Sequence, residues 1–165
     1  MSAKTKPSLK YCFVVGDGPI SVGNTNLERR KTMTATQEKD DSLKQAREQA
    51  LCQYEVIDEM ITRLAMAKDD DEREAIEQEI QETSLEVSVR DGWHAQGEEA
   101  EGPEEYLILL CTGGPAVRII GDLENGIPST ARLECQSWFT PWTEVCEGVD
   151  RVILRDYARQ FYFKC

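Results

Sequence analysis

The spacing of apolar residues changes along the chain, and the first clear pattern has helical spacing. Between Asp41 and Lys68 apolar side chains recur every third or fourth residue, which predicts one long amphipathic helix. Side-chain oxygens of Asp40, Asp41 or Ser42 are suited to cap its first turn. The predicted apolar stripe consists of Leu43, Ala46, Ala50, Tyr54, Ile57, Ile61, Leu64 and Ala65.

A second helix is predicted to begin at the acidic run Asp69–Glu72, because carboxylates stabilise the positive end of a helix dipole. Residues 69–82 hold eight acids and a single base, Arg73, for a net charge of −7. Most of this helix must therefore face water, and the two helices are expected to form an αα-hairpin with one very acidic face. Its short apolar face is predicted at Ala75, Ile76, Ile80 and Thr83.

Beyond residue 84 the pattern changes to the two-residue alternation of strands. The run Tyr106–Cys111 is apolar throughout and is predicted to lie centrally, with both faces covered. A last amphipathic helix is expected from about Gly148 to Gln160, and Phe161–Phe163 after it as an aromatic plug or a short added strand. The four predicted strands are Leu85–Arg90, Tyr106–Cys111, Val117–Asp122 and Ala131–Gln136.

These elements predict an α+β fold, in which a four-stranded antiparallel meander sheet carries an N-terminal acidic αα-hairpin and a C-terminal helix packed on the sheet. Residues 41–84 form the hairpin and 85–165 the sheet and last helix, so that 41–165 is one compact domain. Residues 1–40 show no apolar periodicity and are predicted to be a flexible segment. A basic cluster precedes Met33, so residues 1–32 are either an extension upstream of a natural start or a genuine flexible arm.

The net charge of −12 is uneven, since residues 1–32 carry +4 and the rest −16. Such a field repels nucleic acid and attracts basic partners, or it serves solubility alone. No apolar run approaches the roughly 20 residues of a membrane helix. The six cysteines lack paired spacing and two are expected inside regular elements, which favours a reducing cytoplasm.

Catalytic and metal-binding patterns are weak in this sequence. His94 is the single histidine, and it lies in a polar loop. It is a candidate general base only if the fold brings Cys111, Cys135 or Cys146 close. The glycine-rich turns lack the lysine and helix of a phosphate-binding loop. We therefore predict a protein that is not an enzyme, with no catalytic residue, cofactor or metal site.

Two further features are candidates for partner binding. Glutamates crowd the loop around Glu98 and Glu99, without calcium-loop spacing. Trp138 and Trp142 lie within one pentapeptide with Phe139, and these aromatic side chains either close the end of the sheet or anchor a partner. With the acidic helix, the predicted partner-binding residues are Glu72, Glu74, Glu77, Glu79, Glu98, Glu99, Trp138 and Trp142.

Three motifs stand out in the C-terminal half: CTGGPAVRI from Cys111, WFTPWTE from Trp138 and YARQFYF from Tyr157. They resemble motifs in a family of small, acidic, largely uncharacterised proteins of bacteriophages and mobile elements. The resemblance covers about residues 85–163 and leaves residues 1–32 outside. It implies an accessory role in an infected bacterial host, of the anti-defence or anti-CRISPR kind, and supplies no catalytic residues.

The leading hypothesis is thus a non-enzymatic inhibitor that binds a host defence or regulatory complex by presenting an acidic surface to a basic, nucleic-acid-binding site. It would be cytoplasmic, and would contact neither nucleic acid nor membrane directly. The alternatives are a structural accessory protein that oligomerises through its helices and a cryptic enzyme that uses His94 with a cysteine.

Overall fold

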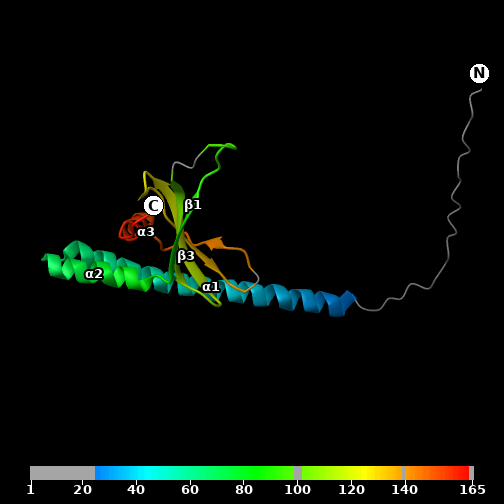
Figure 1. Ribbon diagram of the computed structural model, residues 1–165. Coiled ribbons are helices and arrows are strands. Elements are labelled where there is room, and N and C mark those ends of the chain that lie inside the picture. Colours follow the sequence, from blue (N-terminus) through cyan, green and yellow to red (C-terminus); the bar gives the residue numbers. More distant parts are fainter. Residues whose placement is uncertain (1–24, 99–101, 139, 164–165) are drawn as a thin grey trace, which may run out of the picture.

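The computed structural model describes residues 25–98, 102–138 and 140–163, with side chains from residue 38 onward (Figure 1). This part of the chain is α+β, with three helices and one antiparallel sheet. The helices are α1 (Thr25–Met66), α2 (Asp70–Thr83) and α3 (Arg151–Ala158). The strands are β1 (Glu86–Asp91), β2 (Pro103–Cys111), β3 (Ala116–Glu124), β4 (Ile127–Pro128), β5 (Arg132–Gln136) and β6 (Thr143–Glu144).

The first helix, α1, is 42 residues long and spans about 63 Å. It begins at Thr25, so the predicted start near Asp41 is wrong, and its N-terminal part extends beyond the sheet in Figure 1. Residues 25–40 contain no glycine or proline, so the helix propagates through them from its packed C-terminal part. The predicted stripe is largely confirmed, and the buried positions are Ala46, Ala50, Tyr54, Ile57, Met60 and Leu64.

The acidic helix α2 returns alongside the C-terminal end of α1, as the predicted hairpin requires (Figure 1). Asp69 caps it by accepting a hydrogen bond from the Glu72 amide at 2.8 Å. Ile76 and Ile80 are buried against the core, whereas Ala75, which was predicted on the apolar face, is exposed. Two isoleucines one turn apart therefore anchor the whole helix.

The sheet has the strand order β1-β2-β3-β5-β6, and β4 pairs with β3 outside this path. All four predicted strands are present, but the sheet also includes β4 and β6, which were not predicted. Both added strands are two residues long, and each pairs with a longer neighbour rather than forming from its own hydrophobic pattern. The predicted four-stranded meander is thus replaced by a sheet of six strands in the described chain.

Only one face of this sheet lies under the helices. Along β2 and β3 buried residues alternate with half-buried ones, so the prediction that both faces of Tyr106–Cys111 are covered is wrong. Leu107 and Leu109 point to the second face, on which none of the three described helices packs. The covered face carries Tyr106, Ile108, Val117, Ile119, Leu133 and Cys135.

The C-terminal segment completes the core on the covered face. Asp150 caps α3 by accepting from the Val152 amide at 2.8 Å, and its own amide donates to the Tyr54 hydroxyl at 3.0 Å. The ring of Phe163 lies 4.9 Å from that of Tyr106, so the prediction of an aromatic plug is confirmed for Phe163. The helix α3 is shorter than predicted, and its buried residues are Leu154, Tyr157 and Ala158.

Candidate binding surfaces

The outer face of α2 is a row of carboxylates held on a rigid support. Glu72 makes two capping hydrogen bonds at the start of α2. Its carboxylate accepts from the Lys68 amide at 3.0 Å, and its own amide donates to the Asp69 carboxylate at 2.8 Å. Glu72, Glu74 and Glu79 are exposed, and Glu77 is half-buried. The four predicted glutamates of this helix thus share one element with a fixed backbone, but they differ in their neighbours.

Two of these glutamates are neutralised locally. Glu79 pairs with Arg63 of α1, with Nη2 and Oε2 3.0 Å apart, and this contact raises the pKa of the arginine. Glu77 lies 3.8 Å from Arg73 in a looser pair. Glu74, Asp70 and Asp71 make no hydrogen bond or ion pair within the described residues, so they provide the uncompensated charge of this surface. The acidic face of α2 is defined below as Asp70, Asp71 and Glu74.

The two predicted tryptophans lie between β5 and β6 and differ in exposure. Trp138 is 65% exposed, in the turn after β5, so the interpretation that it closes the core is wrong for this residue. Trp142 is half-buried, and the guanidinium of Arg118 lies 4.0 Å above its ring centre. Arg118 also donates to Glu134 from Nε and Nη2, at 2.9 and 2.7 Å. Trp142 is therefore fixed by a cation, while Trp138 presents most of its surface to solvent.

The remaining predicted site residues lie apart from these surfaces. Glu98 is exposed in the loop after β1, and Glu99 lies outside the described residues. His94, in the same loop, is exposed, with Nδ1 3.2 Å from the carbonyl oxygen of Gly92. The described cysteines lie in other elements: Cys52 in α1, Cys111 in β2, Cys135 in β5 and Cys146 after β6.

Burial explains the chemistry of two of these thiols. Removal from water raises the pKa of Cys111 and of Cys135, so both are thiols rather than thiolates at neutral pH. A neutral buried thiol is a poor nucleophile, and neither cysteine lies in the loop of His94. The arrangement of the described residues therefore provides no observed support for the cysteine–histidine hypothesis.

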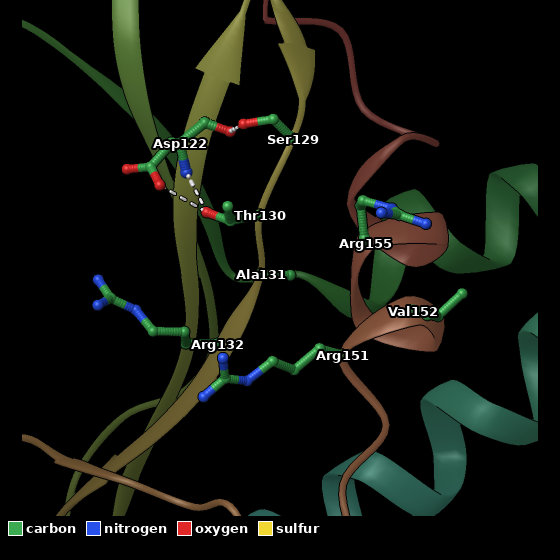
Figure 2. Close-up of a pocket in the computed structure, with 8 residues that line it drawn as sticks. All are labelled: Asp122, Ser129, Thr130, Ala131, Arg132, Arg151, Val152 and Arg155. Atoms are coloured by element: carbon green, nitrogen blue, oxygen red, sulfur yellow. Dashed lines mark hydrogen bonds between the residues drawn. The ribbon is translucent and has the colours of Figure 1, made fainter.

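A basic hollow that the sequence analysis missed lies between the edge of β5 and α3 (Figure 2). Its volume is about 350 Å³, and its wall includes the hydroxyls of Ser129 and Thr130. Asp122 organises these residues, because its carboxylate and amide both bond the Thr130 hydroxyl, at 2.7 and 2.9 Å. Three arginines from two elements line it: Arg132 of β5, and Arg151 and Arg155 of α3.

The arginines of this hollow do not converge on one point. In Figure 2 Arg151 reaches from α3 toward the strand that carries Arg132, whereas the guanidinium of Arg155 points away from both. Arg151 is already paired with Glu144, at 2.6 Å. The Nε atom of Arg155 is buried without a hydrogen-bond partner in the described part of the chain. The hollow carries more basic than acidic side chains on a protein of net charge −12, and no helical or strand periodicity could have revealed it.

Two further properties concern the helices and the polar side chains of the residues that the structure describes. None of the helices there is both long and apolar enough to span a bilayer. The same residues contain no group of three or more histidine, cysteine or acidic side chains placed to hold a metal ion.

A comparison of the chain with models of protein families, with curated proteins and with solved structures finds no match.

Proposed function

We propose that this protein acts by binding another macromolecule rather than by catalysis, and that the partner presents a basic surface to the acidic face of α2. In the setting that the family resemblance implies, the partner is a host defence or regulatory complex, and occupation of its nucleic-acid-binding surface inhibits it. The observation that carries the proposal is the set of three exposed, uncompensated carboxylates, Asp70, Asp71 and Glu74, on one rigid helix.

The support beneath these carboxylates makes the surface suitable for recognition. Ile76 and Ile80 are buried, so the helix does not have to fold on binding and its charges keep fixed positions. Exposed charges of one sign also speed the encounter with an oppositely charged partner, an effect that salt screens over about 8–10 Å. A row of fixed carboxylates can therefore compete with phosphates for a basic groove.

Trp138 supports a second contact for the same function. An exposed tryptophan is a common centre of binding energy in protein interfaces, because its ring buries a large apolar area. Binding through Trp138 depends little on salt, whereas binding through α2 weakens as salt rises. The salt dependence of binding thus separates the two surfaces.

The test uses two variants with matched changes. One carries Asp70→Asn, Asp71→Asn and Glu74→Gln, and the control carries Asp40→Asn, Asp41→Asn and Glu48→Gln on α1. All six positions are exposed, and each variant changes the net charge from −12 to −9. The α1 control should retain the stability of the wild type to within about 0.5 kcal/mol, since exposed charges contribute little. The α2 variant should lose about 1 kcal/mol and stay folded, because Asp70 and Asp71 lie in the first turn of α2 and stabilise the helix dipole.

Each variant and the wild type are immobilised and exposed to a lysate of bacterial cells at two salt concentrations. We expect the wild type and the α1 control to retain the same proteins, which double-stranded DNA then releases, and the α2 variant to lose them. Equal retention by both variants would contradict the role of α2. If only a Trp138→Ala variant fails to retain these proteins, the contact lies at Trp138 and not on α2.

A further inference from the structure

The strand β1 forms one edge of the sheet in the part of the chain that the structure describes. An edge strand turns the amide and carbonyl groups of every second residue away from its neighbour, so that another strand can pair with it. Its pairing with β2 is regular from Glu86 to Arg90 and becomes irregular between Arg90 and Asp91. Five residues with a regular backbone are therefore available for pairing.

The apolar side of β1 is also uncovered. Leu85, Val87 and Val89 are 62%, 39% and 40% exposed, although their alternation predicts a half-buried strand. The cause is the placement of the helices, since α1 lies across β3 and β5 and leaves the β1 end of the same face open. Among the residues that the structure describes, neither a covering helix nor a lysine protects this edge.

The sequence of this edge is complementary to itself. In Glu86-Val-Ser-Val-Arg90, the two ends carry opposite charges and the two valines flank a central serine. When two such strands run antiparallel about Ser88, Glu86 of each copy lies opposite Arg90 of the other, and Val87 lies opposite Val89. Directly opposed pairs of opposite charge and of β-branched side chains stabilise an antiparallel ladder.

We propose that two copies of this chain associate through β1, paired antiparallel about a two-fold axis at Ser88, so that their sheets join into one. This symmetry is compatible with the backbone. In an antiparallel pair centred on Ser88, the outward amide of each residue lies opposite an outward carbonyl of the other copy, whether the odd-numbered or the even-numbered residues of β1 point outward. The interface is isologous, as in most protein homodimers.

The charged pairs fit the contacts that β1 already makes. The guanidinium of Arg90 bonds Glu105 of β2, and its remaining N–H groups can donate to Glu86 of the second copy. Each interface then holds two chains of alternating charge, Glu105–Arg90–Glu86, related by the axis. The Ser88 hydroxyl bonds Glu86 in the single chain and holds its carboxylate on this face of the strand.

This interface is separate from the acidic face of α2 and from the helices, so the two proposals can fail independently. Two chains of net charge −12 repel one another at long range, and ordinary ionic strength reduces that repulsion. The dimer is therefore expected at high protein concentration in about 0.15 M salt, where the Debye length is about 8 Å.

Sedimentation and light scattering of the full chain at increasing concentration test the proposal. The wild type is expected to approach twice the 18.7 kDa mass of one chain. Glu86→Arg places like charges opposite each other at both ends of the interface, and should raise the dissociation constant at least about tenfold. Glu124→Arg, the same change at an exposed end of β3, is the matched control and should leave the dimer intact.

The decisive experiment mixes two variants that are each monomeric. Glu86→Arg in one chain and Arg90→Glu in the other restore opposite charges at both ends of the interface. The mixture should therefore form a heterodimer with about the mass of the wild-type dimer. Because Arg90→Glu also removes the bond to Glu105, circular dichroism first checks that this variant is folded. Hydrogen exchange of the β1 amides in the wild type, which needs no variant, should slow as protein concentration rises.

Three results would overturn the proposal. The first is a wild type that stays monomeric at high concentration, including the case in which its β1 amides are protected by another segment of the same chain. The second is a Glu86→Arg variant that dimerises like the wild type, which places the interface elsewhere. The third is a mixture of the two folded variants that remains monomeric.

Discussion

The two faces of the sheet are built from alternate residues of the same strands, yet they have opposite properties. Ile119 is fully buried beneath the helices, whereas its neighbour Ile120 is half-buried on the open face. The covered face is almost entirely apolar, and the open face mixes leucines with the ion pairs Arg118–Glu134 and Arg90–Glu105. The helical layer accounts for the difference, because the backbone of the two faces is the same.

The comparison separates stability from recognition. The covered face buries its side chains away from water and supplies most of the stabilisation from the sheet. The open face leaves apolar area in contact with solvent and pairs its charges with one another. It also carries Trp142 beneath Arg118, and the sheet edge at β1 is unprotected in the described chain.

The largest difference is expected between Ile119→Ala and Ile120→Ala. Both changes remove the same atoms from adjacent residues of β3, but only the first opens a cavity in the core. Ile119→Ala should lower the free energy of unfolding by about 3–4 kcal/mol, and Ile120→Ala by about 1 kcal/mol or less. Urea denaturation of both variants measures the two values, and equal losses would show that the open face is also covered in solution.

A smaller difference is expected between the two arginines of the open face. Arg118 is 20% exposed, bonds Glu134 and lies over Trp142, whereas the side chain of Arg90 is 74% exposed. Arg118→Ala should cost about 1–2 kcal/mol, because a half-buried carboxylate loses its partner, and Arg90→Ala about 0.5 kcal/mol or less. Denaturation under conditions that keep the chain monomeric gives both values. A cost at Arg90 as large as that at Arg118 would argue against exposure as the deciding factor.

Alkaline pH tests the polar groups of the covered face. Burial raises the pKa of Tyr106 and of Tyr157 above the ordinary value of 10.0. Each phenol is then neutral in the fold where the unfolded chain already ionises, so stability is complete below about pH 10 and falls as pH rises further. The raised pKa values of Cys111 and Cys135 act in the same direction at lower pH.

Tyr106→Phe should therefore reduce the loss of stability between about pH 10 and 11.5. At pH 7 it should cost about 1 kcal/mol, because the hydroxyl donates to the Thr130 carbonyl oxygen at 2.8 Å. Tyr162→Phe is the control, since Tyr162 is 81% exposed and should change neither value. An alkaline profile that is the same for all three proteins would contradict the burial of Tyr106.

The smallest perturbation is chemical labelling of the cysteines in the native protein. Cys52 and Cys146 are exposed, whereas Cys135 is buried on the covered face with a raised thiol pKa. Iodoacetamide at pH 8 should therefore modify Cys135 at least about tenfold more slowly than Cys52 and Cys146, with Cys111 between them. Peptide mass spectrometry over time reads each site, and fast labelling of Cys135 would show that the helical layer opens readily.

Features that depend on local periodicity were predictable from the sequence. The alternation of Val117 and Ile119 with Arg118 identified which side of β3 is buried, because successive side chains of a strand point to opposite faces. The apolar stripe of α1 and the acidic start of α2 followed in the same way from the 3.6-residue helical repeat and from capping chemistry. The partner-binding residues proposed on α2 stay predictions, but their exposure agrees with the charge pattern.

Other features depended on which elements meet in space. Periodicity records which side of a strand is apolar and carries no information on whether another element reaches it. The alternation of Leu85, Val87 and Val89 predicted a half-buried strand. These side chains are exposed, because α1 crosses β3 and β5 rather than β1. The apolar run of β2 predicted a strand covered on both faces, but the helices pack on one face of the sheet. The hollow of Arg132, Arg151 and Arg155 also depends on tertiary placement, because α3 packs beside β5. The edge of β1 is open because no further strand of the described chain pairs with it.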